Sequence, residues 1–225
     1  VDDETIKAMQ NPDTLDPREA TIKVNDVLNA EGTLPDLTKV KAWAKKNIKD
    51  PIRAAAFVAT VEAESESGLV ENGYTKAGAI SKFVDPYYEN GLLSSKFQAR
   101  KDAIEALPDD ATGDDIFDIV YGNRFENTEP NDGSKYKGRG IIQLTFKENY
   151  RKVGELLGLD LVSNPELVND PKHAAAVAMA YLTLPGKNFF IGDMNANKLS
   201  QVIGQAGSGD SRFERAEQLK REMYN

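Results

Sequence analysis

The stretch that decides the fold is residues 51–66, which read PIRAAAFVATVEAESE. Asp50 and Pro51 form a helix start, because Asp caps helix N-termini well and Pro fits the first helical position. The residues from Ile52 to Val61 are apolar on nearly every face of a helix. The stretch therefore predicts a helix buried on all sides by other elements.

The same start signal recurs at Asp170 and Pro171, ahead of a second apolar run over residues 174–182. Apolar residues at helical spacing predict three more helices. Their faces are Leu37, Val40, Ala44 and Ile48, then Phe146, Tyr150, Val153 and Leu157, then Phe213, Ala216, Leu219 and Met223.

Strand signals are few, and residues 140–145 are the best short candidate. Residues 121–138 are rich in Asn, Gly and Asp and predict a long loop, which in a compact domain is more often functional than idle. We therefore expect a mainly α protein with little or no β structure. Residues 1–35 form an N-terminal segment of unassigned role, and residues 36–225 form one domain.

The composition excludes several kinds of chemistry. The 225 residues contain no Cys and a single His, His173, so disulfides, thiolate metal sites and His-rich metal clusters are not expected. His173 is expected to be a cap or core residue near a helix start. The net charge of −8 argues against nucleic acid as a partner and against long-range attraction to an anionic cell wall. No apolar run is long enough to insert into a membrane.

Three carboxylates follow the buried helix, at Glu62, Glu64 and Glu66. Apolar surroundings raise the pKa of a carboxyl group and keep its proton available for donation, as a glycosidase requires. Helical phase favours Glu64, which continues the face of Phe57 and Val61, only modestly over the other two. The alternative is that all three are solvated charges at a fraying helix end.

Two further features complete a candidate site. Glu71, seven positions beyond Glu64, is a candidate second carboxylate for activating water. The run from Tyr136 to Thr145 contains two glycines that let the backbone approach a ligand, and its polar side chains suit sugar hydroxyls and N-acetyl groups. A glycine-rich turn packed under a helix is the alternative reading of that run.

These residues carry a family resemblance. The run Gly138-Arg139-Gly140-x-Ile142-Gln143-Leu144-Thr145, followed by Asn149-Tyr150, resembles the signature of family 19 chitinases and their relatives among phage endolysins. Residues 57–65 resemble the helix that carries the catalytic Glu of those enzymes. The resemblance covers roughly residues 37–223 and implies a lysozyme-like fold, with two helical lobes flanking a substrate cleft.

Carried over position by position, the resemblance implies Glu64 as the general acid, Glu71 as the second carboxylate and Thr145 as the residue that holds the attacking water. It implies substrate binding by Tyr136, Arg139, Gln143, Asn149 and Arg212. Such enzymes invert the anomeric centre, and they use neither a metal nor an organic cofactor.

The chain departs from the family at several positions. Ala63 stands where the family has a His before the acid, and Glu66 lies in an acid-Ser-Gly context of its own, so Glu66 is the reserve candidate for the acid. The family's Asn-Gly-Gly near the C-terminus is replaced by residues 204–206, Gly-Gln-Ala. Residues 77–118 match only loosely.

The main hypothesis from the resemblance is a phage-encoded, bacteriolytic glycosidase that cuts β-1,4 bonds of peptidoglycan at the bacterial cell wall. It would act as a monomer when free, or as part of a larger virion protein. The second hypothesis is a chitinase, with the same site and another polymer. The third is a non-catalytic virion or wall-binding module, which Ala63 and residues 204–206 favour and an intact Glu64, Gln143 and Thr145 oppose.

Overall fold

The computed structural model describes most of the chain after residue 36. The described residues are 37–66, 70–89, 92–140, 142–187, 189, 192–203 and 209–225. Within the helices and strands, the side chains of residues 63–66, 89, 171, 172, 174, 175, 203, 209 and 210 are outside the description. The expected N-terminal segment, residues 1–35, and the departure at residues 204–206 also lie outside the described residues.

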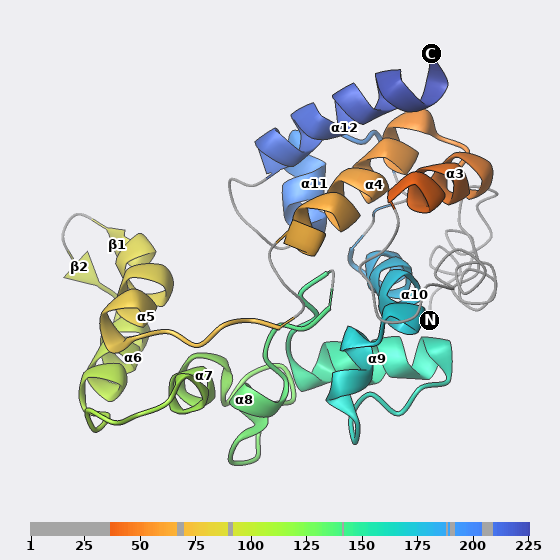
Figure 1. The fold of residues 1–225 in the computed structure, drawn as a ribbon. Helices are drawn as coiled ribbons and strands as arrows, with labels where there is room; N and C mark the ends of the chain where they lie inside the picture. The colour runs from red at the N-terminus through yellow and green to blue at the C-terminus, as the bar shows by residue number, and fades with distance from the viewer. Residues whose placement is uncertain are drawn as a thin grey trace.

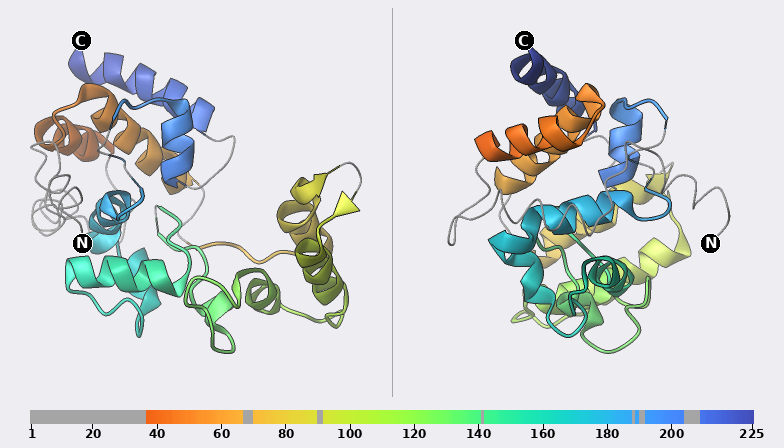
Figure 2. Two further views of the ribbon diagram at one scale, coloured as in Figure 1. Left: turned by 180° about the vertical axis from the view of Figure 1, so that it is seen from behind. Right: turned by 90° about the vertical axis from the view of Figure 1, so that its right-hand side faces the viewer.

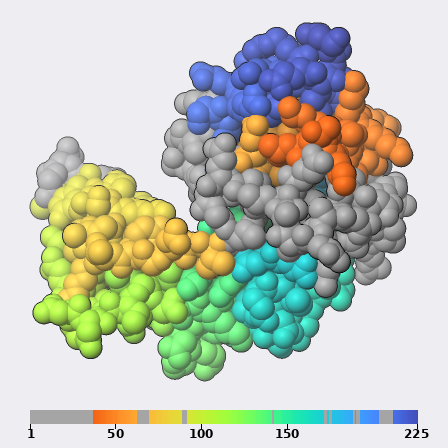
Figure 3. Space-filling view, viewed as in Figure 1, coloured from red at the N-terminus to blue at the C-terminus, as the bar shows by residue number. Residues whose placement is uncertain are grey.

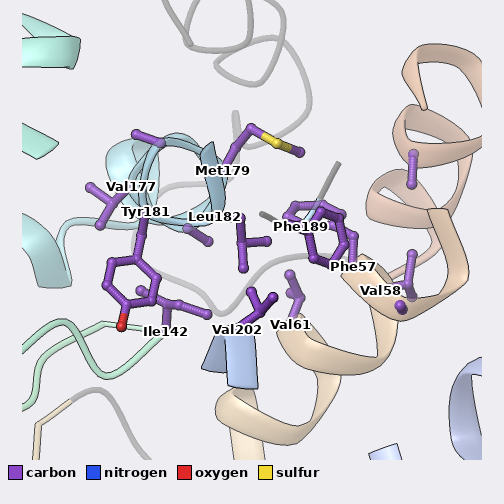
Figure 4. Close-up of a cluster of buried hydrophobic side chains, with 14 of the residues drawn as sticks. Phe57, Val58, Val61, Ile142, Val177, Met179, Tyr181, Leu182, Phe189 and Val202 are labelled. Atoms are coloured by element: carbon purple, nitrogen blue, oxygen red, sulfur yellow. The ribbon is translucent and has the colours of Figure 1, made fainter. Parts of the chain in front are cut away.

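The larger lobe is built around α4 (Pro51–Glu66) and α10 (Pro171–Thr183), which face one another across its core (Figures 1 and 4). Asp50 starts α4 by accepting a hydrogen bond from the Ile52 N–H (3.0 Å). The side chains from Ala54 to Ala59 are buried, as the apolar sequence predicts. The remaining elements of this lobe are α3 (Leu37–Asn47), α9 (Lys147–Leu157), the 3-10 helix η2 (Pro165–Asn169), α11 (Ala196–Ile203) and α12 (Gly209–Tyr224).

The smaller lobe has a hydrophobic core of its own, formed by Ala79, Val84, Ile104, Ile116 and Val120. It projects from the side of the larger lobe (Figure 2). Its elements are α5 (Lys76–Phe83), the 3-10 helix η1 (Asp85–Tyr87), strands β1 (Tyr88–Glu89) and β2 (Leu92–Leu93), α6 (Ser95–Glu105) and α7 (Gly113–Tyr121). The two strands form a short antiparallel hairpin, and this is the only named sheet among the described residues.

A loop and a tight turn connect the lobes. The expected long loop contains the four-residue helix α8 (Asp132–Lys135). The expected strand over residues 140–145 is wrong, because the chain reverses there and makes only an isolated antiparallel bridge between Arg139 and Leu144. Gly140 and Gln143 adopt positive φ values (69° and 48°), which a turn tolerates and an extended strand does not.

The expected fold class is confirmed as mainly α, with two helical lobes and very little β structure. The buried helices α4 and α10 begin at Pro51 and Pro171 as expected, and His173 lies in the first turn of α10. The helices of the smaller lobe were not predicted individually. None of the helices in the described part of the chain is long and apolar enough to cross a membrane.

Candidate active site

A cleft of about 1020 Å³ lies between the two lobes (Figure 3). The smaller lobe and the segment that leads into it contribute several lining residues, the first of which is Val70 and the last Tyr121. The larger lobe contributes others, such as Tyr181 and Arg212. The turn around Gln143 forms part of the wall between them. The cleft therefore lies between two lobes that have separate hydrophobic cores, and ligand sites are often found between such units.

Glu71 lies in the lining of this cleft and is half-buried. Its backbone N–H donates to the carbonyl of Gly138 (2.9 Å), and the Gly138 N–H donates to its carboxylate Oε2 (3.2 Å). An antiparallel bridge between Val70 and Arg139 extends the same contact. The segment after α4 is thus pinned to the glycine turn, and the pinning places the Glu71 carboxylate at the cleft.

Two tyrosines donate to the same carboxylate. The Tyr121 hydroxyl lies 2.9 Å and 3.0 Å from the two Glu71 oxygens, and the Tyr74 hydroxyl lies 3.2 Å from Oε1. Burial raises the pKa of Tyr121, and the adjacent Glu71 charge raises it further. Burial also raises the pKa of Tyr74, although Lys82, which donates to its hydroxyl, opposes this shift. Both tyrosines therefore remain protonated donors at neutral pH.

The turn at residues 138–146 presents the polar side chains of Gln143 and Thr145 to the cleft, and the first turn of α9 presents Asn149. The Thr145 hydroxyl donates to the Gln143 carbonyl (2.8 Å), and the Asn149 amide donates to the Thr145 carbonyl (2.7 Å). Because its one proton is engaged, the Thr145 oxygen can only accept from a water molecule in the cleft. This geometry suits the expected role of holding the attacking water.

Strained backbone accompanies this turn. Phe146, at the start of α9, has φ 75° and ψ 136°, an unusual conformation for an aromatic residue. Phe146 also lines the cleft, next to Gln143 with its positive φ. Strain of this kind costs about 1–3 kcal/mol per residue and tends to cluster at functional sites.

Two expected substrate-binding residues do not line the cleft. Tyr136 is buried, with 1% of its surface exposed, and its hydroxyl donates to the Val162 carbonyl (3.0 Å). The Arg139 guanidinium donates to the Lys135 carbonyl (2.6 Å) and to the Tyr150 hydroxyl (3.2 Å). Both residues support the turn on the side that faces away from the cleft. The expected binding residues Gln143, Asn149 and Arg212 do line the cleft.

The structure distinguishes Glu62 from the other two glutamates at the end of α4. Glu62 forms a two-point ion pair with Arg215 of α12, through contacts of 2.6 Å and 2.8 Å. Hydrogen bonding to Arg215 lowers the pKa of Glu62, which makes it a poor proton donor. The side chains of Glu64 and Glu66 are outside the described residues, so their expected roles stay predictions.

The Glu62–Arg215 pair should contribute to stability in a pH-dependent way. Because folding lowers the Glu62 pKa, the contribution is complete above the ordinary Glu pKa and is lost as the pH falls through the folded value. We expect Glu62→Gln to cost on the order of 1 kcal/mol at pH 7 and distinctly less at pH 3. Urea unfolding at both pH values checks this; a pH-independent difference would contradict it.

Gly138 has no room for a side chain. An added Cβ would lie 2.7 Å from the Gln143 Oε1 and 3.0 Å from the Glu71 Oε2. We expect Gly138→Ala to displace both groups and to reduce turnover roughly 100-fold, as misplacements of about 1 Å can.

The matched control is Gly158→Ala, at the end of α9. Gly158 has φ 67° with open space around its Cβ position, so the substitution strains the backbone without approaching the cleft. We expect it to lower the melting temperature and to leave turnover intact. Equal turnover in both variants would show that the close approach at Gly138 is irrelevant to activity.

Comparisons with known proteins fit this geometry. Residues 118–198, just over a third of the chain, match the family described as chitinase class I. Chitinase 11 of Oryza sativa subsp. japonica is 58% identical over 45 residues, which is 20% of this chain and 18% of that protein. Basic endochitinase of Vitis vinifera is 53% identical over 36 residues, 16% of this chain and 12% of that protein.

A third relative, inactive chitinase-like protein 1 of Hevea brasiliensis, is 58% identical over 36 residues, 16% of this chain and 12% of that protein. The chain spans less than a fifth of the length of these curated relatives. The family match includes Gln143, Thr145 and Asn149 but neither Glu64 nor Glu71. The shared segment therefore includes the turn with its polar side chains but not the acids, whose assignment rests on the geometry around Glu71 and on the sequence resemblance.

Proposed function

We propose that this chain is a glycoside hydrolase that cuts β-1,4 bonds between N-acetylated amino sugars, with Glu64 as the general acid and Glu71 as the base. The observation that carries the proposal is the Glu71 carboxylate, held at the cleft by Tyr121, Tyr74 and the Gly138 N–H. A carboxylate fixed by donors beside neutral polar side chains is what a sugar hydrolase needs to activate water.

In the proposed reaction Glu71 takes a proton from a water molecule that also donates to the Thr145 oxygen. The water attacks the anomeric carbon while Glu64 protonates the leaving oxygen, and the glycosidic bond breaks. The attack from the opposite face inverts the anomeric centre, so a β bond yields an α product. No metal is needed for this chemistry, because carboxylates supply both the acid and the base.

Chitin is the substrate that the names of the relatives favour, since several are chitinases. Peptidoglycan is the second candidate, as the resemblance to phage endolysins implies. It is favoured by the charge of the cleft lining. The described lining residues include five cations, Lys82, Arg100, Arg124, Lys187 and Arg212, and two glutamates, Glu71 and Glu148. An acidic protein thus has a cationic cleft, which suits an anionic polymer better than neutral chitin.

The test compares hydrolysis of soluble chitin oligomers with hydrolysis of purified peptidoglycan. NMR of the first product tests inversion, and mass spectrometry of released muropeptides identifies the new reducing end and therefore the bond cut. Activity on peptidoglycan would also support the proposed action of a phage-encoded protein on bacterial cell walls. Binding to either polymer without hydrolysis would favour the non-catalytic wall-binding module.

A further inference from the structure

Two arginines in the wall of the cleft form no ion pair with an acidic residue among those that the structure describes. Arg100 of α6 donates one hydrogen bond, from Nη1 to the Phe83 carbonyl (3.2 Å). Arg124, which follows α7, has a buried Nε without a hydrogen-bond acceptor, and its guanidinium forms no ion pair with any described residue. Both side chains are half-buried and line the cleft.

Three other arginines of the described residues form ion pairs. Arg53 binds Asp50 (2.9 Å), Arg151 binds Glu126 and Glu155 (2.7 Å and 2.9 Å), and Arg215 binds Glu62 (2.6 Å). A half-buried cation without a counter-ion costs free energy, because its desolvation is not compensated. The missing partners of Arg100 and Arg124 therefore need an explanation.

Aromatic rings hold the two guanidinium groups in place. Arg124 lies over the ring of Phe146 (4.6 Å to its centroid) and over that of Phe125 (5.2 Å). Arg100 lies over Phe97 (5.2 Å), which stacks in turn on Tyr87 (3.9 Å between centroids). Ring faces attract cations and fix their planes, but they leave the N–H groups at the guanidinium edges available to an acceptor.

The charge of Arg100 also acts on Arg124. Burial lowers the pKa of Arg124, and the charge of Arg100 lowers it further. Burial likewise lowers the pKa of Arg100. A half-buried cation whose charged form is disfavoured by burial is stabilised by an anion that binds to it.

The pair stands close to the proposed catalytic carboxylate. Arg124 packs on Phe146, the Phe146 ring makes an edge contact with Tyr121 (5.3 Å), and Tyr121 donates to Glu71. A sugar unit bound next to Glu71 therefore places its substituents within reach of this wall.

We propose that Arg100 and Arg124 form an anion subsite of the cleft, which binds a carboxylate carried by the glycan substrate. The inference rests on the proposed function of the cleft as a glycan-binding site. Guanidinium groups match carboxylates through paired hydrogen bonds, and this planar geometry gives specificity as well as affinity. Chitin carries no such group. Peptidoglycan strands carry carboxylates on the stem peptide and, after the peptide is removed, on the lactyl group of the sugar.

The test measures equilibrium binding by calorimetry in a Glu64→Gln background, which suppresses turnover. The probes are a chitin oligomer, a peptidoglycan oligomer with its peptides, the same oligomer with its carboxylates amidated, and a peptide-free strand with free lactyl carboxylates. The comparison between the second and the fourth probe separates the peptide carboxylates from the lactyl carboxylate.

We expect Arg100→Gln and Arg124→Gln each to weaken binding of the carboxylate-bearing oligomers roughly 10- to 100-fold, as loss of a charged hydrogen bond does. Binding of chitin and of the amidated oligomer should change less than about threefold, since neither probe offers an anion. Arg124→Lys should give an intermediate loss of affinity, because Lys keeps the charge but lacks the planar guanidinium that donates two hydrogen bonds to one carboxylate.

Arg221→Gln is the matched control, because it removes the same charge from an exposed position of α12, outside the cleft lining. Equal losses for charged and neutral probes, or losses that Arg221→Gln reproduces, would overturn the subsite. If one cleft variant fails to fold, the other arginine and the salt dependence of wild-type binding give the same comparison. Failure of the wild type to hydrolyse any probe would refute the proposed hydrolase, whereas the binding ratios would still decide the subsite.

Discussion

Replacement of Glu71 by Gln is expected to lower turnover about 1000-fold, within the range for loss of a general base. Gln cannot take a proton from water, although it fills the same space. One of its two polar ends presents N–H donors where Tyr121, Tyr74 and Gly138 donate now, so we also expect a stability loss on the order of 1 kcal/mol. Steady-state kinetics on the preferred polymer and urea unfolding measure the two effects.

Glu148→Gln is the matched control for Glu71→Gln. Glu148 also lines the cleft, but its carboxylate pairs with Lys152 on the same helix (2.5 Å). We expect its replacement to leave turnover within about threefold, since a partly exposed i,i+4 ion pair on a helix contributes little. Near-normal activity of Glu71→Gln would exclude Glu71 as the base, and another carboxylate of the cleft would then have to take that role.

Glu64→Gln is expected to reduce turnover by about 10²–10⁴-fold while the protein remains folded, because the leaving oxygen loses its proton donor. The sequence leaves Glu66 as the alternative acid, so the same measurement is made on Glu66→Gln. Glu62→Gln serves as the third member of the set. Glu62 is bound to Arg215, so its replacement should lower stability and leave turnover nearly intact.

The three variants separate the roles of the three glutamates. Loss of activity in Glu66→Gln with near-normal activity in Glu64→Gln would reassign the general acid to Glu66. A large loss in Glu62→Gln, with stability preserved, would contradict the structural role that the Arg215 ion pair assigns to Glu62. Comparison of melting temperatures across the set separates unfolding from a direct effect on turnover.

Helices α3, α4, α9, α10 and α12 of the larger lobe could be predicted because their signals are local, whereas α11 was not predicted. Asp50 with Pro51, and Asp170 with Pro171, start α4 and α10, and the residues 54–59 and 176–182 that follow are buried. The individual helices of the smaller lobe were not predicted. In α6, for example, the amphipathic pattern is weak, and Ile104 is its only buried residue. Its stability comes from contacts with α5 and α7, which local patterns do not reveal.

Motif similarity alone did not show which residues of the run face the cleft. Tyr136 and Arg139 stand in the most distinctive run of the chain, but they support the turn from the core side. Which side chains of a turn face the cleft depends on its backbone angles. Gln143 and Phe146 have positive φ values, which cannot be predicted from their residue types because Gln and Phe rarely adopt them.

The sequence by itself determined the mainly α fold, the start of both buried helices and the polar character of the turn at Gln143 and Thr145, because these depend on neighbours within a few positions. Only the tertiary structure decided which charges meet. Glu71 is bound by Tyr121 and Gly138, 50 and 67 positions away, and Glu62 by Arg215, 153 positions away. Such contacts depend on how elements that are distant in the sequence pack together, and packing is a property of the whole chain.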